Sequence, residues 1–352
     1  MEYCSLSEII NSKVVVCCDF DVPLDINLNI SSDYRIKRCI PTISTLLKNN
    51  NKILILTKLG RPTKKEESLS TKNIIPKLKY LLGENIYFEN ELNNLKISID
   101  QNKIVIFENI RFFSWSELDY LKNNPEEAKE ISKVTKQFEY FVDEAFAMSH
   151  RKEASNYFFP KVIGKVAAGE NYLNEISHLS KIRIGRFERP AYFVLGGAKA
   201  ETKIPLMQDI MSHFDLFLIG GLMPKEIMNS PELSASLQGR SYLANLLPSG
   251  LDISEESTKQ ITSRVSSATT IIWNGPLGKF ESELYQKSTV KLIEAIESNT
   301  RALKIIGGGD TISAVEKFGN FKNYTFVSTG GGAMFSFLAN KKTNLEALGM
   351  QF

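Results

Sequence analysis

Short apolar runs alternate along the chain with longer segments whose apolar residues recur three and four positions apart. In the first half, four runs have the length and composition of strands: KVVVCCDF (13–20), NKILILTKL (51–59), QNKIVIFENI (101–110) and FEYFVDEAF (138–146). The segment 34–49, between the first two, has the spacing of an amphipathic helix. Because strands and helices alternate, we predict right-handed crossovers and a parallel sheet.

The second half repeats this scheme, and there each apolar run stops at a glycine-rich or phosphate-friendly turn. The five segments are AYFVLGGAK (191–199), LFLIGG (216–221), TIIWNGPLG (270–278), LKIIGGGDT (303–311) and TFVSTGGG (325–332). A chain of 352 residues has the material for two cores. We therefore predict an α/β protein with two parallel sheets, linked by a long amphipathic helix over residues 162–182.

Composition narrows the classes of partner. The chain is 43% hydrophobic and 24% charged, and its formal net charge of +3 is too small to indicate nucleic acid or an anionic membrane. No apolar run is long enough to span a bilayer, and the first ten residues lack the basic start and apolar core of a secretory signal. The four cysteines lack zinc-site spacing, so we expect buried free thiols in a reducing cytoplasm.

The glycine turns predict an anion site on the second sheet. Glycine lets backbone N–H groups approach a ligand closely, and a helix that starts at the turn adds free N–H donors and a partial positive charge. Several such turns on one sheet edge suit a polyphosphate. Lys199 and Lys203 follow Gly197 and would share one helix face beside the turn. The alternative for both lysines is an ordinary surface position.

The segment GGGDT adds an acidic residue to this site. Asp310 would repel a naked phosphate, but it fits if Mg²⁺ lies between the two, and the alternative is a plain helix N-cap. Thr311 is expected to cap the helix, and residues 330–332 supply a further group of backbone N–H donors. The residues able to contact a ribose or a phosphate from WNGPLGKFE are Asn274, Pro276 and Glu281. Neither a Walker A sequence nor a complete GxGxxG is present, so we expect a nucleotide site of another kind.

The first half offers arginines instead of glycine turns. Arg61, Arg111 and Arg151 lie at strand ends or in the loops that follow them, and Arg35 opens the first helix. Guanidinium groups make two-point contacts with carboxylate and phosphate oxygens, so their convergence on one sheet edge would bind a small, highly anionic substrate. Salt bridges to the many carboxylates of the chain are the alternative. A basic site on one sheet and a nucleotide site on the other predict a cleft between domains that closes for transfer.

These segments together resemble phosphoglycerate kinase, in order and over nearly the whole chain. The segments that carry the resemblance are CDFDVPL, DYRIKRCIPTI, TKLGRP, ENIRFF, VDEAFAMSHRKEAS, GGAKAETKI, TIIWNGPLGKFE, IIGGGDT and VSTGGGA. The resemblance implies two Rossmann-like three-layer α/β/α domains with parallel sheets, joined by a helical hinge. The implied parts are a glycerate-substrate domain (1–165), a hinge helix (166–190), a nucleotide-binding domain (191–335) and a tail that returns to the first domain (336–352).

The resemblance also implies Mg²⁺-dependent, reversible phosphoryl transfer between ATP and the carboxylate of 3-phosphoglycerate, giving 1,3-bisphosphoglycerate and ADP, in a cytoplasmic monomer. The implied substrate-binding residues are Asp19, Phe20, Asp21, Arg35, Lys58, Leu59, Gly60, Arg61, Arg111 and Arg151. The implied nucleotide-binding residues are Gly197, Lys199, Lys203, Asn274, Pro276, Glu281, Gly308, Gly309, Asp310 and Thr311. Arg35 and Lys199 would be catalytic, Asp310 would carry Mg²⁺, and Gly330, Gly331 and Gly332 would neutralise charge in the transition state.

Departures from the family's motifs leave other functions open. Asp21 stands where the family has asparagine, which puts an anion beside an anionic substrate, and Lys58 is the cation expected to answer it. Lys58 and Glu153 both replace family histidines, and the segment between residues 221 and 270 is shorter than in the family. The alternatives are a kinase of the same fold that acts on another small carboxylate, a non-catalytic remnant with weakened nucleotide binding and, more remotely, a dinucleotide-dependent dehydrogenase.

Overall fold

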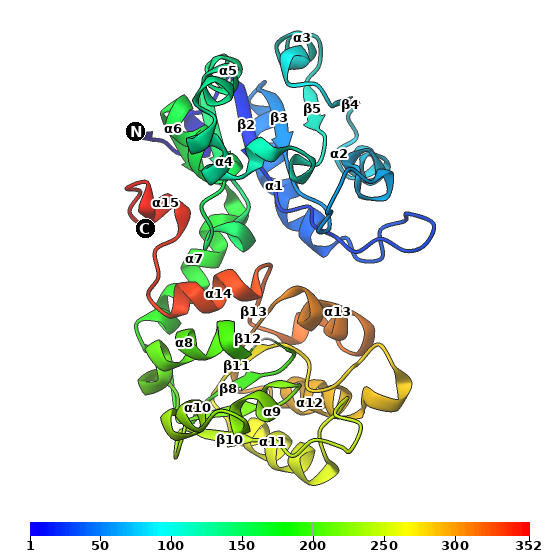
Figure 1. The fold of residues 1–352 in the computed structure, drawn as a ribbon, viewed down its shortest axis with the longest axis vertical. Coiled ribbons are helices and arrows are strands. Elements are labelled where there is room, and N and C mark those ends of the chain that lie inside the picture. The colour runs from blue at the N-terminus through cyan, green and yellow to red at the C-terminus, as the bar shows by residue number, and fades with distance from the viewer. Residues whose placement is uncertain (199) are drawn as a thin grey trace. The chain divides into compact units, whose positions relative to one another are not determined.

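The computed structural model describes residues 1–198 and 200–352, apart from the side chains of residues 200–202. The chain forms two compact units (Figure 1). Unit 1 comprises residues 1–176 and 342–352, and unit 2 comprises residues 177–341. In each unit a wholly parallel sheet carries helices, which confirms the predicted α/β fold class. The finer division into four parts stays a prediction.

Unit 1 contains a seven-stranded sheet. Its strands, in spatial order, are β1 (Glu2–Tyr3), β7 (Lys165–Ala168), β6 (Tyr140–Asp143), β2 (Lys13–Cys17), β3 (Lys52–Leu56), β5 (Ile104–Phe107) and β4 (Ile86–Glu89). Its helices are α1 (Tyr34–Lys48), α2 (Ile75–Leu82), α3 (Leu95–Gln101), α4 (Leu118–Asn123), α5 (Pro125–Thr135), α6 (Phe159–Ile163) and α15 (Asn344–Ala347). The helix α7 (Glu170–Arg183) begins in unit 1 and ends in unit 2.

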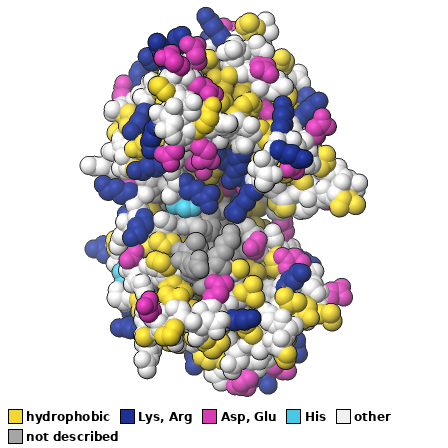
Figure 2. Space-filling model, viewed as in Figure 1, with side chains coloured by type: hydrophobic (Ala, Val, Ile, Leu, Met, Phe, Trp, Pro, Cys, Tyr) yellow, Lys and Arg dark blue, Asp and Glu magenta, His cyan; other side chains and the backbone are white. Residues whose placement is uncertain are grey.

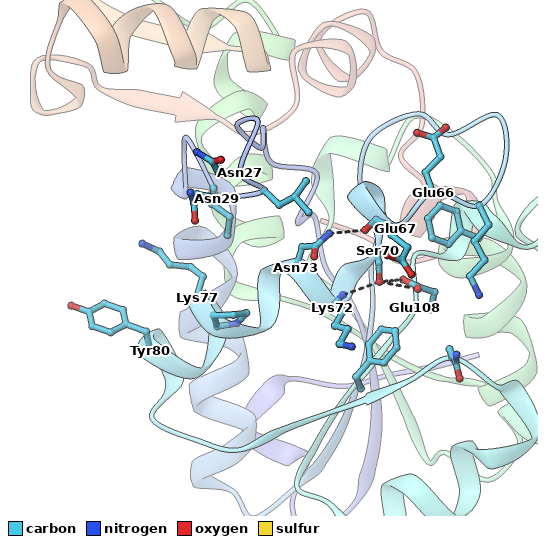
Figure 3. Close-up of a pocket in the computed structure, with 17 residues that line it drawn as sticks. Asn27, Asn29, Glu66, Glu67, Ser70, Lys72, Asn73, Lys77, Tyr80 and Glu108 are labelled. Atoms are coloured by element: carbon cyan, nitrogen blue, oxygen red, sulfur yellow. Dashed lines mark hydrogen bonds between the residues drawn. The ribbon is translucent and has the colours of Figure 1, made fainter.

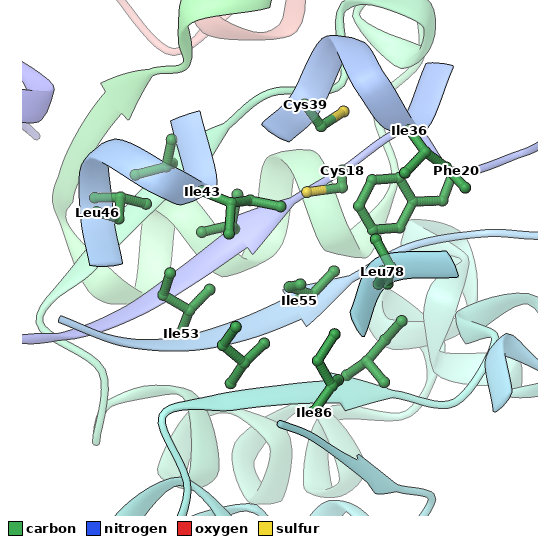
Figure 4. Packing of buried hydrophobic residues seen from close by; sticks show 14 of the residues in the cluster. Cys18, Phe20, Ile36, Cys39, Ile43, Leu46, Ile53, Ile55, Leu78 and Ile86 are labelled. Atoms are coloured by element: carbon green, nitrogen blue, oxygen red, sulfur yellow. The ribbon is translucent and has the colours of Figure 1, made fainter. Parts of the chain in front are cut away.

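Burial on both faces explains why the strands of unit 1 are continuous apolar runs. Val14 and Val16 of β2 belong to a core beneath α1, whose Ile36, Ile43 and Leu46 follow helical spacing (Figure 4). Val15 points to the opposite face, as the period of two in a strand requires, and it is also fully buried. Parallel sheets that are covered on both sides lose the alternation of apolar and polar residues, which is why the runs read as strands.

Unit 2 contains a six-stranded sheet. Its strands, in spatial order, are β10 (Ser241–Leu243), β9 (Leu216–Ile219), β8 (Ala191–Leu195), β11 (Thr270–Asn274), β12 (Leu303–Gly307) and β13 (Phe326–Ser328). Its helices are α8 (Ala200–Ile210), α9 (Met223–Met228), α10 (Pro231–Ser236), α11 (Glu255–Ser267), α12 (Lys287–Ser298), α13 (Gly309–Phe318) and α14 (Gly331–Leu338). Each of the five predicted glycine turns follows a strand.

Two expectations about the elements are corrected. The helix predicted over residues 162–182 begins only at Glu170, because residues 165–168 form β7 at the side of β6. The strands β1, β4 and β7 of unit 1 and β10 of unit 2 were not predicted, and each is only two to four residues long. No helix of the described residues is long and apolar enough to cross a membrane. On the face shown in Figure 2, basic and acidic side chains are interspersed, in keeping with the small net charge.

Candidate functional site

The arginines predicted to bind an anion come together in unit 1. Four neighbouring parallel strands, β6, β2, β3 and β5, end at the same edge of the sheet, and Arg61, Arg111 and Arg151 lie in the loops that follow three of them. Burial lowers the pKa of Arg151, and the positive charges of Arg61 and Arg111 add to this. With Arg35, on the first turn of α1, these three arginines form what we call the arginine cluster.

Asp21 connects two members of the arginine cluster. Its carbonyl oxygen accepts a hydrogen bond from Nη1 of Arg35 at 2.7 Å, and its Oδ2 lies 3.3 Å from Nη1 of Arg111. Its Oδ1 accepts a hydrogen bond from the backbone N–H of Gly60 at 2.8 Å. Both carboxylate oxygens of Asp21 are therefore used inside the cluster.

Asp19 lies deeper than Asp21. Its Oδ2 is 3.5 Å from Nε of Arg35, and its Oδ1 accepts a hydrogen bond from the N–H of Asp21 at 3.3 Å. Burial raises the pKa of the Asp19 carboxyl, and the charge of Arg35 opposes that rise. Asp19 thus orients Arg35 from beneath, as an acid buried next to a guanidinium group can.

Lys58 was expected to answer the charge of Asp21, and that expectation is wrong. Its ammonium forms an ion pair with Glu153 in the loop after β6, whereas Asp21 is answered by Arg111. Burial lowers the pKa of Lys58 to about 8, and Arg111 and Arg151 add to this. The two residues that replace family histidines are therefore partners of each other, a contact that the sequence analysis missed.

Two predicted substrate-binding residues have side chains in the core. Phe20 and Leu59 are fully buried, and Figure 4 shows the ring of Phe20 beside Ile36 and Leu78. Their side chains pack the protein, so any contact with substrate would come from their backbone atoms, and their role in binding stays a prediction. Gly60 differs, because its N–H binds Asp21 and its carbonyl oxygen accepts a hydrogen bond from Arg111.

Asn109 supports the cluster and was not predicted from the sequence. It is fully buried, and its Oδ1 accepts hydrogen bonds from the N–H groups of Leu59 and Arg111 at 3.3 Å and 3.2 Å. Its Nδ2 donates to the carbonyl oxygens of Leu59 and Leu69 at 2.6 Å and 2.8 Å. Asn109 therefore fixes the loop that carries Arg111 to the loop after β3. Its place just before Arg111 in ENIRFF is the signal that could have found it.

In unit 2, the glycine turns after β8, β9 and β11 pack directly on one another. The N–H of Gly197 donates to the carbonyl oxygen of Pro276 at 2.8 Å, and the N–H of Gly221 donates to that of Leu277 at 3.0 Å. A Cβ on Gly221 or on Gly275 would lie 2.4 Å from backbone atoms of the 196–197 turn. These glycines are required so that three turns can form one surface, which we call the glycine rim.

The turns after β12 and β13 join the glycine rim through Asn274. Its Nδ2 donates to the carbonyl oxygen of Gly307 at 2.7 Å, and a Cβ on Gly331 would lie 2.3 Å from that Nδ2. Oγ1 of Thr311 accepts a hydrogen bond from the N–H of Gly275 at 2.8 Å. Asn274 and Thr311 are both buried, so their side chains hold the turns together. The expected cap by Thr311 is corrected, because Gly308 is the N-cap of α13.

Asp310 lies exposed on the first turn of α13, next to Gly309. Among the described residues, no ion pair or side-chain hydrogen bond engages its carboxylate. Gly330 is the N-cap of α14, and Gly332 lies exposed on the first turn of that helix. Nζ of Lys203 donates to the carbonyl oxygen of Gly196 at 2.8 Å, which places it at the rim. The predicted Lys199 lies outside the described residues.

A cavity of about 220 Å³ opens beside the glycine rim. Its lining includes the predicted residues Gly197, Pro276 and Glu281, together with Leu222 and Leu251, whose side chains are partly exposed. The leucines come from the turn after β9 and from the loop before α11, where the sequence carries no motif that points to them. They give the cavity an apolar wall, and both belong to the segment between residues 221 and 270.

A larger cavity of about 940 Å³ lies elsewhere in unit 1 (Figure 3). Loops around Asn27 and Ser70, helix α2 and Glu108 line it, and none of the predicted site residues that the structure describes does. The carboxylate of Glu108 is held by Ser70 and by the N–H of Thr71 at 2.8 Å and 2.9 Å. Size alone therefore does not identify the site, because the predicted anion-binding residues lie in the arginine cluster and the glycine rim.

The two units define a class of α/β protein that presents anion-binding groups at the carboxyl ends of two parallel sheets. The family model described as phosphoglycerate kinase matches residues 5–237 and 242–341. The chain belongs to the phosphoglycerate kinase family.

Relatives and solved structures agree with this assignment over most of the chain. The chain is 31% identical to phosphoglycerate kinase of Helicobacter pylori strain J99, over 94% of this chain and 92% of that relative. It is 28% identical to the cytosolic enzyme of Nicotiana tabacum, over 94% and 93%. The crystal structure of phosphoglycerate kinase from Pyrococcus horikoshii superposes with a TM-score of 0.81 at 26% identity, covering 97% of this chain and 96% of that one. For the Coxiella burnetii structure the TM-score is 0.72, also at 26% identity, over 96% and 95%.

Proposed function

We propose that the chain catalyses reversible phosphoryl transfer between ATP and the carboxylate of 3-phosphoglycerate, giving 1,3-bisphosphoglycerate and ADP. The observation that carries the proposal is that the loops and the helix bearing the arginine cluster lie at one sheet edge, where Arg35 and Arg111 share Asp21, in a chain that belongs to the phosphoglycerate kinase family. Action as a cytoplasmic monomer, as the resemblance implies, belongs to the same proposal.

The acceptor would bind to unit 1. 3-Phosphoglycerate carries a carboxylate and a phosphate, and forked guanidinium groups match both. Arg61 and Arg151 are the members of the cluster that no carboxylate of the described residues engages within ion-pair distance, so they are available for the phosphate. Arg35 is held by Asp19 and by the carbonyl of Asp21. In this position it would stabilise the charge on the transferred phosphoryl group.

The donor would bind to unit 2. The base would enter the cavity beside Leu222 and Leu251, and the phosphates would lie along the glycine rim near Lys203. Asp310 fits a magnesium ligand, because it is an exposed carboxylate at a helix start that would otherwise repel phosphate. No three His, Cys, Asp or Glu side chains gather as metal ligands among the described residues. The ion would therefore draw its other ligands from phosphate and water, and it would neutralise phosphate charge.

For this reaction the protein needs only to position the two substrates and to stabilise the charge that develops between them. A carboxylate oxygen of the acceptor attacks the γ-phosphorus, an O–P bond forms, and the bond to the β-phosphate oxygen breaks to release ADP. Because the carboxylate is already ionised at neutral pH, no general base is needed. Guanidinium groups and the N–H donors at the starts of α13 and α14 would stabilise the charge on the transferred group.

A second candidate is a kinase of the same fold that acts on another small carboxylate. The observation in its favour is that Arg111 is paired with Asp21 and Lys58 with Glu153. Unit 1 therefore offers fewer unpaired cations to a substrate than its number of basic residues suggests. A purely structural remnant has less support, because the arginine cluster is assembled in full.

Release of ADP that depends on the acceptor tests the proposed function. With Mg·ATP, 3-phosphoglycerate should give turnover, whereas glycerate, lactate and acetate should give little. Asp310→Asn should lower turnover by roughly 100-fold, since it removes the proposed metal ligand. Glu316→Gln removes an exposed carboxylate later in the same helix and should leave turnover unchanged. Turnover on another acid, with none on 3-phosphoglycerate, would favour the second candidate.

A further inference from the structure

The contacts of Asp21 point beyond the proposed reaction. Its carboxylate bridges the N–H of Gly60, at 2.8 Å, and Nη1 of Arg111, at 3.3 Å. Donors of these kinds, a backbone N–H and a guanidinium group, are the ones that bind carboxylate or phosphate oxygens of ligands. The side chain of Asp21 is 33% exposed, so an anion can approach it from solvent.

We propose that Asp21 occupies an anion subsite built by Arg111 and Gly60 and lowers the affinity of that subsite for anions. The chain thereby carries its own carboxylate where a ligand anion would bind. An anionic ligand must displace this carboxylate from Arg111 and also bear its repulsion, so affinity for anions is set lower than the arginine cluster alone would give.

Replacement of Asp21 by asparagine removes the negative charge of the side chain and keeps its size and shape. Asparagine keeps an Oδ1 acceptor for the N–H of Gly60, and it leaves the backbone carbonyl that Arg35 binds in place. The fold of the loop is therefore expected to survive. Only the attraction to Arg111 and the repulsion toward a ligand are removed, so the freed guanidinium group becomes available to an anion.

Calorimetric titration without nucleotide tests this inference on the full chain, using inorganic phosphate and 3-phosphoglycerate as separate probes. Asp21→Asn should tighten binding of both anions by about fivefold. A matched control, Asp119→Asn, removes one negative charge from an exposed pair with Lys122 in the same unit and should change neither affinity. The choice of 3-phosphoglycerate as a probe rests on the proposed function. Inorganic phosphate does not, so its binding tests the inference independently of the proposed reaction.

The outcomes separate the inference from the proposed function. Affinities of Asp21→Asn that stay within about twofold of the wild type, that weaken, or that are too weak to detect for both anions overturn the role of Asp21. Equal tightening by Asp119→Asn also overturns it, because net charge would then explain the effect. If phosphate binds more tightly to Asp21→Asn while 3-phosphoglycerate gives no turnover in any variant, the subsite stands and the proposed reaction fails.

Discussion

At the scale of single residues, the positions where this chain departs from its family's motifs have charged partners inside unit 1. Lys58 pairs with Glu153, and Asp21 pairs with Arg111. A buried charge is costly unless a group of opposite charge compensates it. A lysine at position 58 without Glu153 would leave a buried ammonium group without a carboxylate. Each of these charged residues is therefore compensated by a partner of opposite charge in unit 1.

Glu153→Gln should destabilise unit 1 in a manner that depends on pH. The pKa of Lys58 is about 8 in the folded protein against an ordinary 10.5, so the unfolded chain binds more protons between these values and stability rises with pH there. A carboxylate favours the charged form of a neighbouring ammonium group, so its removal should lower that pKa further. We expect Glu153→Gln to lower the free energy of unfolding by about 3 kcal/mol near pH 6, because Lys58 is then either charged without a partner or deprotonated at a pH far below its ordinary pKa. Near pH 9, where Lys58 is mostly neutral, we expect almost no loss.

Fluorescence of Trp115 in a Trp273→Phe background measures this effect. The chain has two tryptophans, one in each unit, so Trp115 then reports urea unfolding of unit 1 alone. Glu130→Gln serves as the control, because it breaks an exposed pair with Lys133 and should cost at most about 0.5 kcal/mol. An equal loss near pH 6 and near pH 9 would contradict the pairing of Glu153 with Lys58.

At the scale of elements, the glycine rim packs three turns together in addition to its proposed role in binding. The turns after β8, β9 and β11 touch through backbone atoms, which only residues without a Cβ allow. The N–H groups at the starts of α13 and α14 remain directed away from their helices, and these are the groups that can serve an anion. Glycine-rich motifs therefore meet two different requirements. Those after β8, β9 and β11 allow the turns to pack closely, and those before α13 and α14 leave N–H groups that can serve an anion.

A pair of glycine substitutions distinguishes tight packing from backbone strain. Gly221 and Gly239 both have positive φ, of 63° and 72°, but a Cβ at Gly221 meets the 196–197 turn, whereas a Cβ at Gly239 meets nothing within 4 Å. Gly239→Ala should cost about 1 kcal/mol from strain alone. Gly221→Ala should cost at least about 2 kcal/mol more, since backbone atoms must move.

Unfolding of unit 2, followed by the fluorescence of Trp273 in a Trp115→Phe background, gives both values. Similar losses for the two variants would show that the turns after β8 and β9 do not pack as described. A second readout, Mg·ADP binding, should fall for Gly221→Ala and stay unchanged for Gly239→Ala, because Gly221 lines the cavity beside the rim.

At the scale of the whole molecule, the last residues of the chain belong to the unit formed by the first. Asn344 is buried in unit 1, where its N–H donates to the carbonyl oxygen of Ser149 at 2.7 Å. Its amide donates to Oδ2 of Asp143 at 2.5 Å and accepts from the hydroxyl of Tyr172 at 2.9 Å. These contacts hold the loop after β6, on which Arg151 lies, to α7 and α15.

Asn344→Ala should therefore weaken unit 1 and the arginine cluster together. We expect a loss of about 3 kcal/mol, because buried groups such as the carboxylate of Asp143 lose their partner. Unfolding reported by Trp115 and titration with 3-phosphoglycerate measure the two effects. Lys342→Ala, two residues earlier and exposed, is the control and should change neither. Full stability of Asn344→Ala would show that the tail contributes nothing to unit 1.

The sequence predicted the fold class and the place of the arginine cluster, because both follow from long apolar strands and from loops at their carboxyl ends. It could not predict that Phe20 and Leu59 have side chains in the core, since membership of a motif does not distinguish packing from contact with ligand. The pair of Lys58 and Glu153 also escaped prediction, because it joins loops that are distant in sequence. Leu222 was missed because the cavity wall carries no motif.

Trapping of the acyl phosphate with hydroxylamine tests the central claim most directly. Acyl phosphates react with hydroxylamine to give hydroxamates, so this reagent detects transfer to a carboxylate rather than hydrolysis of ATP. With Mg·ATP and 3-phosphoglycerate, we predict hydroxamate in amounts equal to the ADP released, and none when Mg²⁺ or 3-phosphoglycerate is omitted. Release of ADP without hydroxamate, or release of neither, would contradict phosphoryl transfer to the carboxylate of 3-phosphoglycerate.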